Sequence, residues 1–410
     1  MADGRKTPGP LCGIRVIECA HWYLAPIAGQ ILGDLGADVI KIEERGRGDP
    51  TRGITDVGDI AGNVTGRSLY FECVNRNKRG IALDLRKERG RGLIYQLVKE
   101  ADVFLTNLRQ SSLQKLEIDY DDISPLNPRI IYAYGSGWGS LGKLADAPAL
   151  EPVALARSGA MNSVGEADMP PIRYATSLGD TLGSWILVQA ILAALYVREK
   201  SGIGQRVEAS LFGSLVAWQA LPILTKSIAG KEFPRRARKD YRNPLYNFYK
   251  CSDGRWIQLA MAQSDRYWHD FCQVMGISHL KNDPRFHDAD ARKQKAEEIV
   301  LILDKIFATK AMEDWCKLFS NSKGDFIYAP IRKAYELLDD PQALANEYIV
   351  DFNHCVWGQV KTVGFPYQFS RNQTSLRRAA PEFGEHTEEV LLEIGYTWED
   401  ISKLKEEEVI

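Results

Sequence analysis

The segment GIRVIECAHWYLAPIAGQILGDLGADVIKIE, residues Gly13–Glu43, decides the fold of this 410-residue chain. It starts with Gly13–Cys19, a short run rich in β-branched residues that predicts a buried strand of a parallel sheet. Ala25–Leu35 has small and apolar residues at helical spacing, and Gly36 supplies the stop signal of a helix. Ala37–Glu43 reads as the next strand. The sequence therefore predicts a compact strand–helix–strand unit.

The same alternation continues as far as Ser136. Strand patterns occur at Gly80–Leu85, Asp102–Leu108 and Arg129–Ser136, and a helix pattern occurs at Gly90–Ala101. Strands that alternate with helices are typical of a doubly wound α/β sheet, which we expect over this region. A long apolar helix is predicted to follow from about Thr181 to Lys200.

The middle of the chain has a different texture. The basic stretch Arg235–Asn243 is typical of a linker, and Leu245–Met261 holds two strand patterns around the hairpin turn Ser252–Gly254. Charged helical segments continue to about Leu338, and acidic amphipathic helices end the sequence. We therefore expect a second, smaller α+β domain.

Composition excludes several classes of protein. The 52 Lys and Arg against 54 Asp and Glu leave no excess of cations for a nucleic acid as the main partner. The seven cysteines form no CxxC pair and the six histidines form no HxxxH, so we expect neither disulfides nor a metal site. The polar start lacks the apolar stretch of a signal peptide, and Trp185–Val197 is shorter than the ~18 residues of a membrane span. We expect a soluble, cytoplasmic enzyme that needs no membrane.

Two loops resemble nucleotide-binding motifs without completing them. Gly137–Lys143 matches the start of a P-loop, but Leu144 stands where Ser or Thr must bind Mg²⁺, so ATP or GTP hydrolysis is disfavoured. The loop Cys19–Pro26 lacks the GxGxxG motif of NAD- or FAD-binding units. The run Asn75–Arg79, NRNKR, suits phosphate contacts or a solvated charged surface.

Asp180 lies where the long apolar helix begins, and two interpretations fit it. An aspartate there can act as the N-cap that accepts hydrogen bonds from free backbone N–H groups. It can also act as a carboxylate nucleophile whose oxyanion the same N–H groups stabilise. Spacing alone favours the cap.

Six segments in the same order make the chain resemble the class III CoA-transferases, which include formyl-CoA and carnitine CoA-transferases. The segments are Pro10–Arg52, Asn75–Leu85, Asp102–Gln110, Leu178–Leu211, Asp253–Met261 and Ala380–Tyr396. The resemblance implies a Rossmann-like large domain (residues 1–225) completed by the C-terminal segment (335–410), with the smaller α+β domain at 226–334 and its linkers. It also implies an interlocked dimer, either of one chain or of two related chains.

The resemblance assigns roles to single residues as well. The catalytic aspartate of the family falls on Asp180, which would form an aspartyl anhydride and then an aspartyl-CoA thioester while CoA passes from an acyl-CoA to a carboxylic acid. Gly137 and Gly139 would offer backbone N–H groups to the anionic intermediates. No metal, ATP or permanently bound cofactor is implied. The residues implied to contact CoA are His21, Tyr23, Arg45, Asn77, Arg79, Asn107 and Arg109.

The chain departs from the family pattern at several positions. Leu155 stands where the family often has Gln, and Ala147 replaces the basic residue that commonly precedes Pro148. The glycine-rich loop of oxalate-using members is missing before the hairpin, so oxalate is not an expected acceptor. Trp22, Tyr23 and Trp138 place aromatic surface near the expected site. We therefore expect a bulky or aromatic acid such as benzylsuccinate, with succinyl-CoA as donor.

Two alternatives stay open from the sequence. An α-methylacyl-CoA racemase has the same fold and aspartate but pairs it with a histidine some thirty residues earlier, near Leu150 here, and no histidine lies between His21 and His269. Because proton abstraction needs a second base, this alternative is weaker. The other is a non-catalytic partner subunit of a related active chain.

Overall fold

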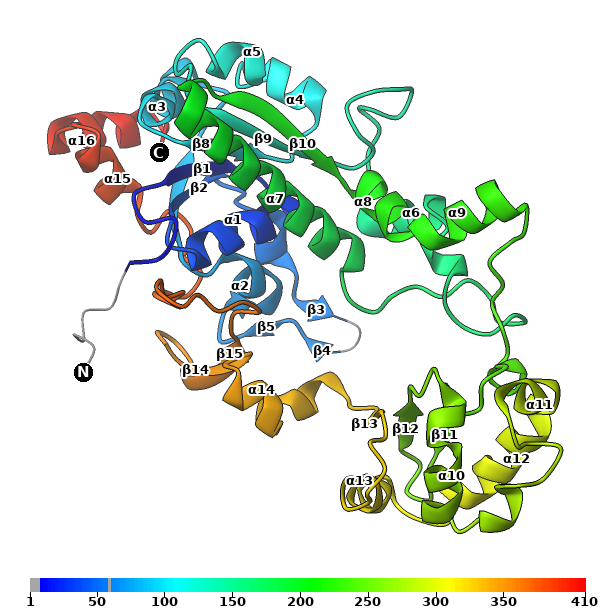
Figure 1. Cartoon of the computed structure of the whole chain (residues 1–410). Coiled ribbons are helices and arrows are strands. Elements are labelled where there is room, and N and C mark those ends of the chain that lie inside the picture. Colours follow the sequence, from blue (N-terminus) through cyan, green and yellow to red (C-terminus); the bar gives the residue numbers. More distant parts are fainter. Residues whose placement is uncertain (1–7, 58–59) are drawn as a thin grey trace. The chain divides into compact units, whose positions relative to one another are not determined.

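The computed structural model of the chain describes residues 8–57 and 60–410 (Figure 1). It contains two compact units. The first consists of Met1–Met161, Arg173–Leu224 and Pro341–Ile410, and the second consists of Asn162–Ile172 and Thr225–Asp340. The C-terminal segment therefore belongs to the same unit as the strand–helix–strand start.

The first unit is built on a six-stranded sheet with the order β10-β9-β8-β1-β2-β7, and every pairing in it is parallel. The strands are β1 (Arg15–Cys19), β2 (Asp38–Glu44), β7 (Lys78–Leu83), β8 (Val103–Thr106), β9 (Ile131–Ser136) and β10 (Gln205–Ser210). The predicted α/β class with a parallel central sheet is confirmed.

The strand order reverses between β1 and β8. The chain proceeds from β1 through β2 to β7 on one side, and from β8 through β9 to β10 on the other. At the carboxyl ends of the two central strands, Cys19 pairs with Thr106. Loops that leave such a point in opposite directions open a crevice, which is where ligands bind in open parallel sheets.

Helices cover both faces of this sheet (Figure 1). On one face, α1 (Leu24–Asp34) and α7 (Leu178–Ser201) pack on the β-branched side chains of β1 and β8. On the other face, α3 (Glu88–Lys99) packs together with the C-terminal helices α15 (Thr387–Glu393) and α16 (Trp398–Glu406). Successive residues of a strand point to opposite faces, so β1 contributes to both cores.

Helix α7 is long and apolar enough to cross a membrane by length and composition, and α8 (Leu211–Trp218) with α9 (Ala220–Ala229) forms a bent pair that also passes that test. Leu187 and Ile191 of α7 are nevertheless fully buried in the core of the first unit. The apolar character of α7 is therefore explained by its place in that core.

The second unit has an antiparallel sheet of β11 (Phe248–Lys250), β12 (Trp256–Leu259) and β13 (Tyr328–Pro330). The hairpin predicted around Ser252–Gly254 is confirmed by the pairing of β11 with β12. Aromatic side chains fill the core between this sheet and its helices. Those helices are α10 (Ser264–Val274), α11 (Ala289–Gln294), α12 (Ala296–Phe307) and α13 (Met312–Ser320).

Shorter elements complete the first unit. They are β3 (Asp56–Val57), β4 (Ile60–Ala61), β5 (Asn63–Val64), β6 (Arg67–Ser68), α2 (Leu69–Asn75), α4 (Gln110–Lys115), α5 (Tyr120–Ile123), α6 (Glu151–Arg157), α14 (Pro341–Ala345), β14 (Ile349–His354) and β15 (Gly358–Val363).

Gly29 gives a direct test of how α1 lies on the sheet. A Cβ at Gly29 would overlap a carboxylate oxygen of Glu18, whereas a Cβ at Gly92 of α3 would meet open space. We expect Gly29→Ala to lower the free energy of unfolding by about 1–3 kcal/mol through overpacking. Gly92→Ala should raise it by about 0.5–1 kcal/mol, because alanine favours the helix. Urea unfolding measures both, and a Gly29→Ala protein as stable as Gly92→Ala would contradict this packing.

Candidate active site

The loop after β1 is fixed to the loop after β8 at the point where the strand order reverses. The Asn107 side chain accepts the backbone N–H of His21 at 3.0 Å and donates to the His21 carbonyl at 2.7 Å. Two of the residues that the resemblance assigned to CoA, His21 and Asn107, are thus neighbours. Burial, with the nearby Lys41 ammonium, lowers the pKa of His21 and favours its neutral form.

Asp180 lies at the start of α7, but not at its N-cap. The helix begins at Leu178 with Ser177 as the N-cap residue, so Asp180 is the third residue of the first turn. The N-cap interpretation of Asp180 is therefore wrong. Its carboxylate instead meets the start of α1, where the backbone N–H of Leu24 interacts with it.

The N-termini of α1 and α7 are held together at this point. The Ser184 hydroxyl lies 2.6 Å from the carbonyl oxygens of both Leu24 and Asp180. A Cβ at Gly183 would lie 2.9 Å from the Leu24 side chain, so glycine permits the close approach. Asp180 and the Leu24 N–H are consequently presented by two rigid helices.

The sequence did not single out Glu151, which the structure places beside Asp180. Glu151 begins α6, and its Oε1 accepts the Gly179 N–H at 2.6 Å, so it satisfies a free donor at the start of α7. It thus performs the capping that was predicted for Asp180. A signal existed, because Glu151 precedes Pro152 at the start of a short helix.

Electrostatics make this pair of carboxyl groups unusual. Burial and then the neighbouring Glu151 raise the pKa of Asp180 to about 7, and the Leu24 N–H opposes the shift. Burial also raises the pKa of Glu151. Near neutral pH, Asp180 is consequently poised between its acid and its carboxylate forms.

Tyr23 stands next to this carboxylate. Burial and the nearby Cys73 raise the pKa of its phenol, and Asp180 adds to the shift, so Tyr23 keeps its proton. Its hydroxyl lies 3.3 Å from the Cys73 Sγ, and its ring meets Tyr70 edge-on with 5.7 Å between centroids. Tyr23 therefore presents a protonated hydroxyl on an aromatic surface that α2 extends.

The glycine loop after β9 lies at the same edge of the sheet. The Gly139 N–H donates to Ser136 Oγ at 3.0 Å, and Gly139 has a φ of 94°, which favours glycine. A Cβ at Gly137 would overlap the Ala149 side chain. No helix starts between Gly137 and Leu150, so the loop lacks the helix that follows a P-loop lysine directly.

The remaining predicted CoA contacts separate into two groups. Arg45 and Arg109 follow β2 and β8, so they lie at the carboxyl edge of the sheet with the loops described above. Arg109 is exposed, and Arg45 donates to the backbone oxygen of Ile410 at 3.0 Å. Asn77 and Arg79 lie at the start of β7, at the opposite edge.

Both residues of that second group are bound within the chain. The Asn77 amide donates to Asp34 at 2.7 Å, and the Arg79 guanidinium pairs with Asp38 at 2.6 Å and with Glu393 at 2.6 Å. The structure therefore gathers Asp180, Tyr23, His21, Asn107 and the glycine loop at one edge of the sheet, and it does not bring Asn77 and Arg79 to that edge.

Comparisons with known proteins agree with this geometry. A family model described as CoA-transferase family III matches residues 11–387. The chain belongs to this family. It is an enzyme of the CoA-transferase class, and such enzymes use CoA thioesters as substrates.

Individual relatives cover nearly the whole chain. A (R)-2-hydroxy-4-methylpentanoate CoA-transferase from Clostridioides difficile is 32% identical over 97% of this chain and 98% of its own. A cinnamoyl-CoA:phenyllactate CoA-transferase from Clostridium sporogenes is 30% identical over 97% and 96%. The crystal structure of a CAIB/BAIF family protein from Brucella suis is 28% identical, covers 94% of this chain and 100% of its own, and has a TM-score of 0.83.

The raised pKa of Asp180 should make the free energy of unfolding depend on pH. The folded state holds the Asp180 proton more tightly than the unfolded state, so stability falls as the pH rises from the ordinary value of 3.8 to about 7. Asp180→Asn removes this dependence. We expect the Asp180→Asn protein to exceed the wild type in free energy of unfolding, and to do so by about 3 kcal/mol more at pH 8 than at pH 5. Urea unfolding at the two pH values measures the difference, and an equal gain at both would show an ordinary carboxylate.

Proposed function

We propose that this CoA-transferase moves CoA from an acyl-CoA donor to a carboxylic acid through covalent intermediates on Asp180. The observation that carries the proposal is a carboxylate with a pKa of about 7 that meets a backbone N–H where two helices begin. Burial removes the water shell of the charged form and so makes the carboxylate a stronger nucleophile. The carboxyl edge of the parallel sheet is also where a ligand is expected.

The reaction exchanges a thioester and a carboxylate without any added energy source. The Asp180 carboxylate attacks the donor thioester and expels the CoA thiolate, which leaves a mixed anhydride. The thiolate attacks the aspartyl carbonyl, releases the donor acid and forms an aspartyl-CoA thioester. The acceptor carboxylate then displaces CoA to form a second anhydride, and the thiolate attacks its acyl carbonyl. The new acyl-CoA leaves, and the Asp180 carboxylate is restored.

The neighbouring groups have defined tasks in these steps. The Leu24 N–H is placed to stabilise the oxyanion that develops at the aspartyl carbon. Tyr23, which keeps its proton, offers a second donor. Glu151 holds the start of α7 through Gly179 and keeps the charged form of Asp180 high in energy. His21, Asn107, Arg45 and Arg109 are the residues at this edge that we assign to CoA, with the two arginines for its phosphates.

Trapping of the intermediate tests the role of Asp180. Acyl-CoA plus hydroxylamine should convert Asp180 to a hydroxamate, which peptide mass spectrometry locates. Asp180→Asn should abolish both trapping and transfer. Glu151→Gln is the matched control, because its amide oxygen still accepts from Gly179; it should keep trapping at a reduced rate. Trapping at any other residue would overturn the mechanism.

The same variants separate the two alternatives. A non-catalytic partner subunit would support transfer in its assembled complex even as Asp180→Asn. A racemase would exchange the α-hydrogen of an acyl-CoA for deuterium without an acceptor acid. The deuterium test is worthwhile because a racemase needs a second acid or base, and Glu151 is a carboxyl group close to Asp180. We expect no exchange above the rate of the Asp180→Asn protein.

We further propose a bulky branched or aromatic acceptor acid, such as benzylsuccinate, with succinyl-CoA as donor. Trp22 is 40% exposed, and Tyr23 and Tyr70 form an edge-on aromatic pair beside Asp180. Two of the similar proteins are named for a branched hydroxy acid and for an aromatic one. An apolar side chain that contacts these rings gains binding energy that acetate lacks.

A panel of free acids with succinyl-CoA checks this proposal. We expect kcat/KM for benzylsuccinate, phenyllactate and 2-hydroxy-4-methylpentanoate to exceed that for acetate by at least about tenfold, as one buried apolar group can supply. Product acyl-CoA is quantified by chromatography with mass detection. Turnover of small aliphatic acids alone would contradict the expectation.

A further inference from the structure

A network of buried charges lies beneath the loop that carries Tyr23. Lys41 of β2 pairs with Glu18 of β1 at 3.1 Å and with Asp49 at 3.0 Å, and none of these three side chains is exposed. Lys78 of β7 adds a second ammonium group 2.7 Å from Glu18. Pairing offsets the large cost of removing such charges from water.

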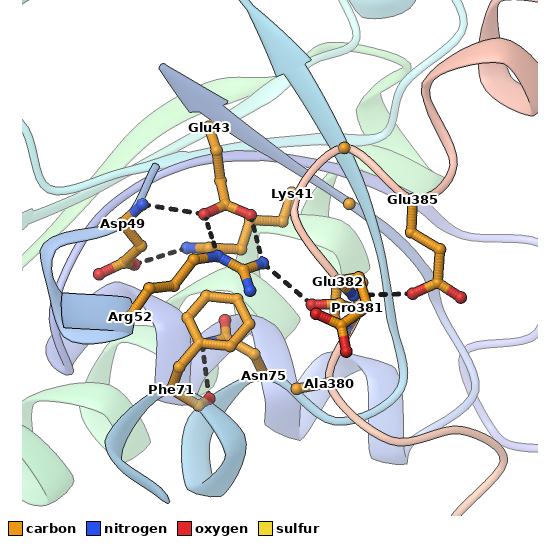
Figure 2. A network of polar contacts seen from close by, with 12 residues as sticks. Lys41, Glu43, Asp49, Arg52, Phe71, Asn75, Ala380, Pro381, Glu382 and Glu385 are labelled. Carbon is orange, nitrogen blue, oxygen red and sulfur yellow. Dashed lines mark hydrogen bonds and ion pairs between the residues drawn. The ribbon is translucent and has the colours of Figure 1, made fainter. Parts of the chain in front are cut away.

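The network continues toward the C-terminal segment, as Figure 2 shows. Glu43 accepts the Asp49 N–H at 2.8 Å and holds the Arg52 guanidinium through two contacts of 2.7 Å. Arg52 also donates to the Pro381 carbonyl at 2.9 Å. Three cations, Lys41, Lys78 and Arg52, thus balance three carboxylates, and the network is neutral as a whole.

This network binds the backbone of residues 20–26, which we call the catalytic loop and which includes the start of α1, at three points. The Lys41 ammonium donates to the Ala20 carbonyl at 2.8 Å, and the Asp49 carboxylate accepts the Trp22 N–H at 3.4 Å. The Lys78 ammonium donates to the Pro26 carbonyl at 2.8 Å. These anchors bracket Tyr23 and the Leu24 N–H, the two groups that meet Asp180.

The loop needs such anchors because one of its residues is strained. Trp22 has a φ of 65°, a left-handed conformation that costs a non-glycine residue roughly 1–2 kcal/mol. Trp22 is 40% exposed, and the loop backbone holds this conformation by donating the Trp22 N–H to Asp49 and the His21 N–H to Asn107.

We propose that Lys41 and Asp49 are positioning residues for the transfer: they fix the backbone of residues 20–22 so that the Leu24 N–H and Tyr23 stay against Asp180. Neither side chain is a catalytic residue, because both are fully buried below the loop. The proposal rests on the proposed role of Asp180. A defect in this network should therefore reach catalysis through the loop.

Asp49→Asn is the first variant that tests this proposal, and Asp102→Asn is its matched control. Like Asp49, Asp102 pairs with a buried cation, which for Asp102 is Arg198 at 2.9 Å. Asp102 precedes β8, however, and so lies at the opposite edge of the sheet. Both substitutions replace a paired carboxylate by an amide of the same shape, and only the first reaches the catalytic loop.

We expect Asp49→Asn to speed amide hydrogen exchange in the peptide 20–26 and to lower kcat by about tenfold. The Asp49 Oδ2 pairs with Lys41 while its Oδ1 accepts the Trp22 N–H, and the single oxygen of an amide cannot keep both contacts. The acid limb of the kcat profile should move to higher pH, because the Leu24 N–H favours the charged form of Asp180, while Glu151 and Tyr23 still face that carboxylate. Asp102→Asn should match the wild type in all three measurements.

The double variant Lys41→Met, Asp49→Leu keeps the test available if Asp49→Asn does not fold. It removes one positive and one negative charge, so Glu18 keeps Lys78 and Glu43 keeps Arg52. Replacement of a buried ion pair by apolar residues is often neutral for stability. The same faster exchange and lower kcat are expected from it.

Two results would overturn the proposal. One is wild-type exchange in the peptide 20–26, whatever happens to kcat. The other is an equal change in Asp102→Asn. Activity of Asp180→Asn would refute the proposed function instead, and the exchange measurement would still report on the loop, so the two failures are distinguishable.

Discussion

The contact on which the first unit depends is the ion pair of Glu18 with Lys41 and Lys78. These three side chains come from β1, β2 and β7, which are consecutive in the sheet, and all are fully buried. A charge in that position is tolerated only with a partner, so the pairing favours this strand order over any other. Gly29 of α1 leaves space for the carboxylate, and the position of that helix follows from the same contact.

The geometry of the candidate active site follows from how two helices begin. Helices α1 and α7 both begin at the carboxyl edge of the parallel sheet. Their free N-terminal N–H groups lie at that edge and favour negative charge there. Glu151 and Asp180 both occupy this region, but Glu151 is engaged by Gly179 while Asp180 meets the Leu24 N–H. One carboxylate is thus used for structure, and the other stays available for chemistry.

Elements determined by neighbouring residues could be predicted from the sequence, but contacts between residues far apart in the chain could not. The strand–helix–strand start and the hairpin around Ser252–Gly254 could be read, because short periodic patterns and turn residues determine them. The group that caps the start of α7 could not be predicted, because the acceptor for the Gly179 N–H is Glu151, 28 residues earlier in the chain. Spacing along one helix contains no information about such a partner.

The run from Asn75 to Arg79 shows the same limit. Its cations and amides suggested phosphate contacts, and the resemblance assigned Asn77 and Arg79 to CoA. In the structure, Asp34 and Asp38 bind these two side chains, and both acids lie some forty residues earlier in the chain. Lys78, between them, points into the core, where burial lowers its pKa to about 8. Side chains alternate between the two faces at the start of β7. The run therefore divides into Asn77 and Arg79, which bind nearby aspartates, and Lys78, which is part of the buried charge network.

The proposed role of Asp180 explains why a transferase would benefit from a partly desolvated carboxylate. The shift of its pKa from 3.8 to about 7 corresponds to roughly 4 kcal/mol by which the site disfavours the charged form relative to an uncharged one. In the proposed mechanism, the anhydride and the aspartyl-CoA thioester are both uncharged at this side chain, so the same burial that would activate the nucleophile would also favour the covalent intermediates. Glu151 adds to this effect by its charge, and its own carboxylate accepts the Gly179 N–H. The Leu24 N–H limits the shift, and Asp180 therefore ionises near neutral pH, where the proposed mechanism requires it to attack.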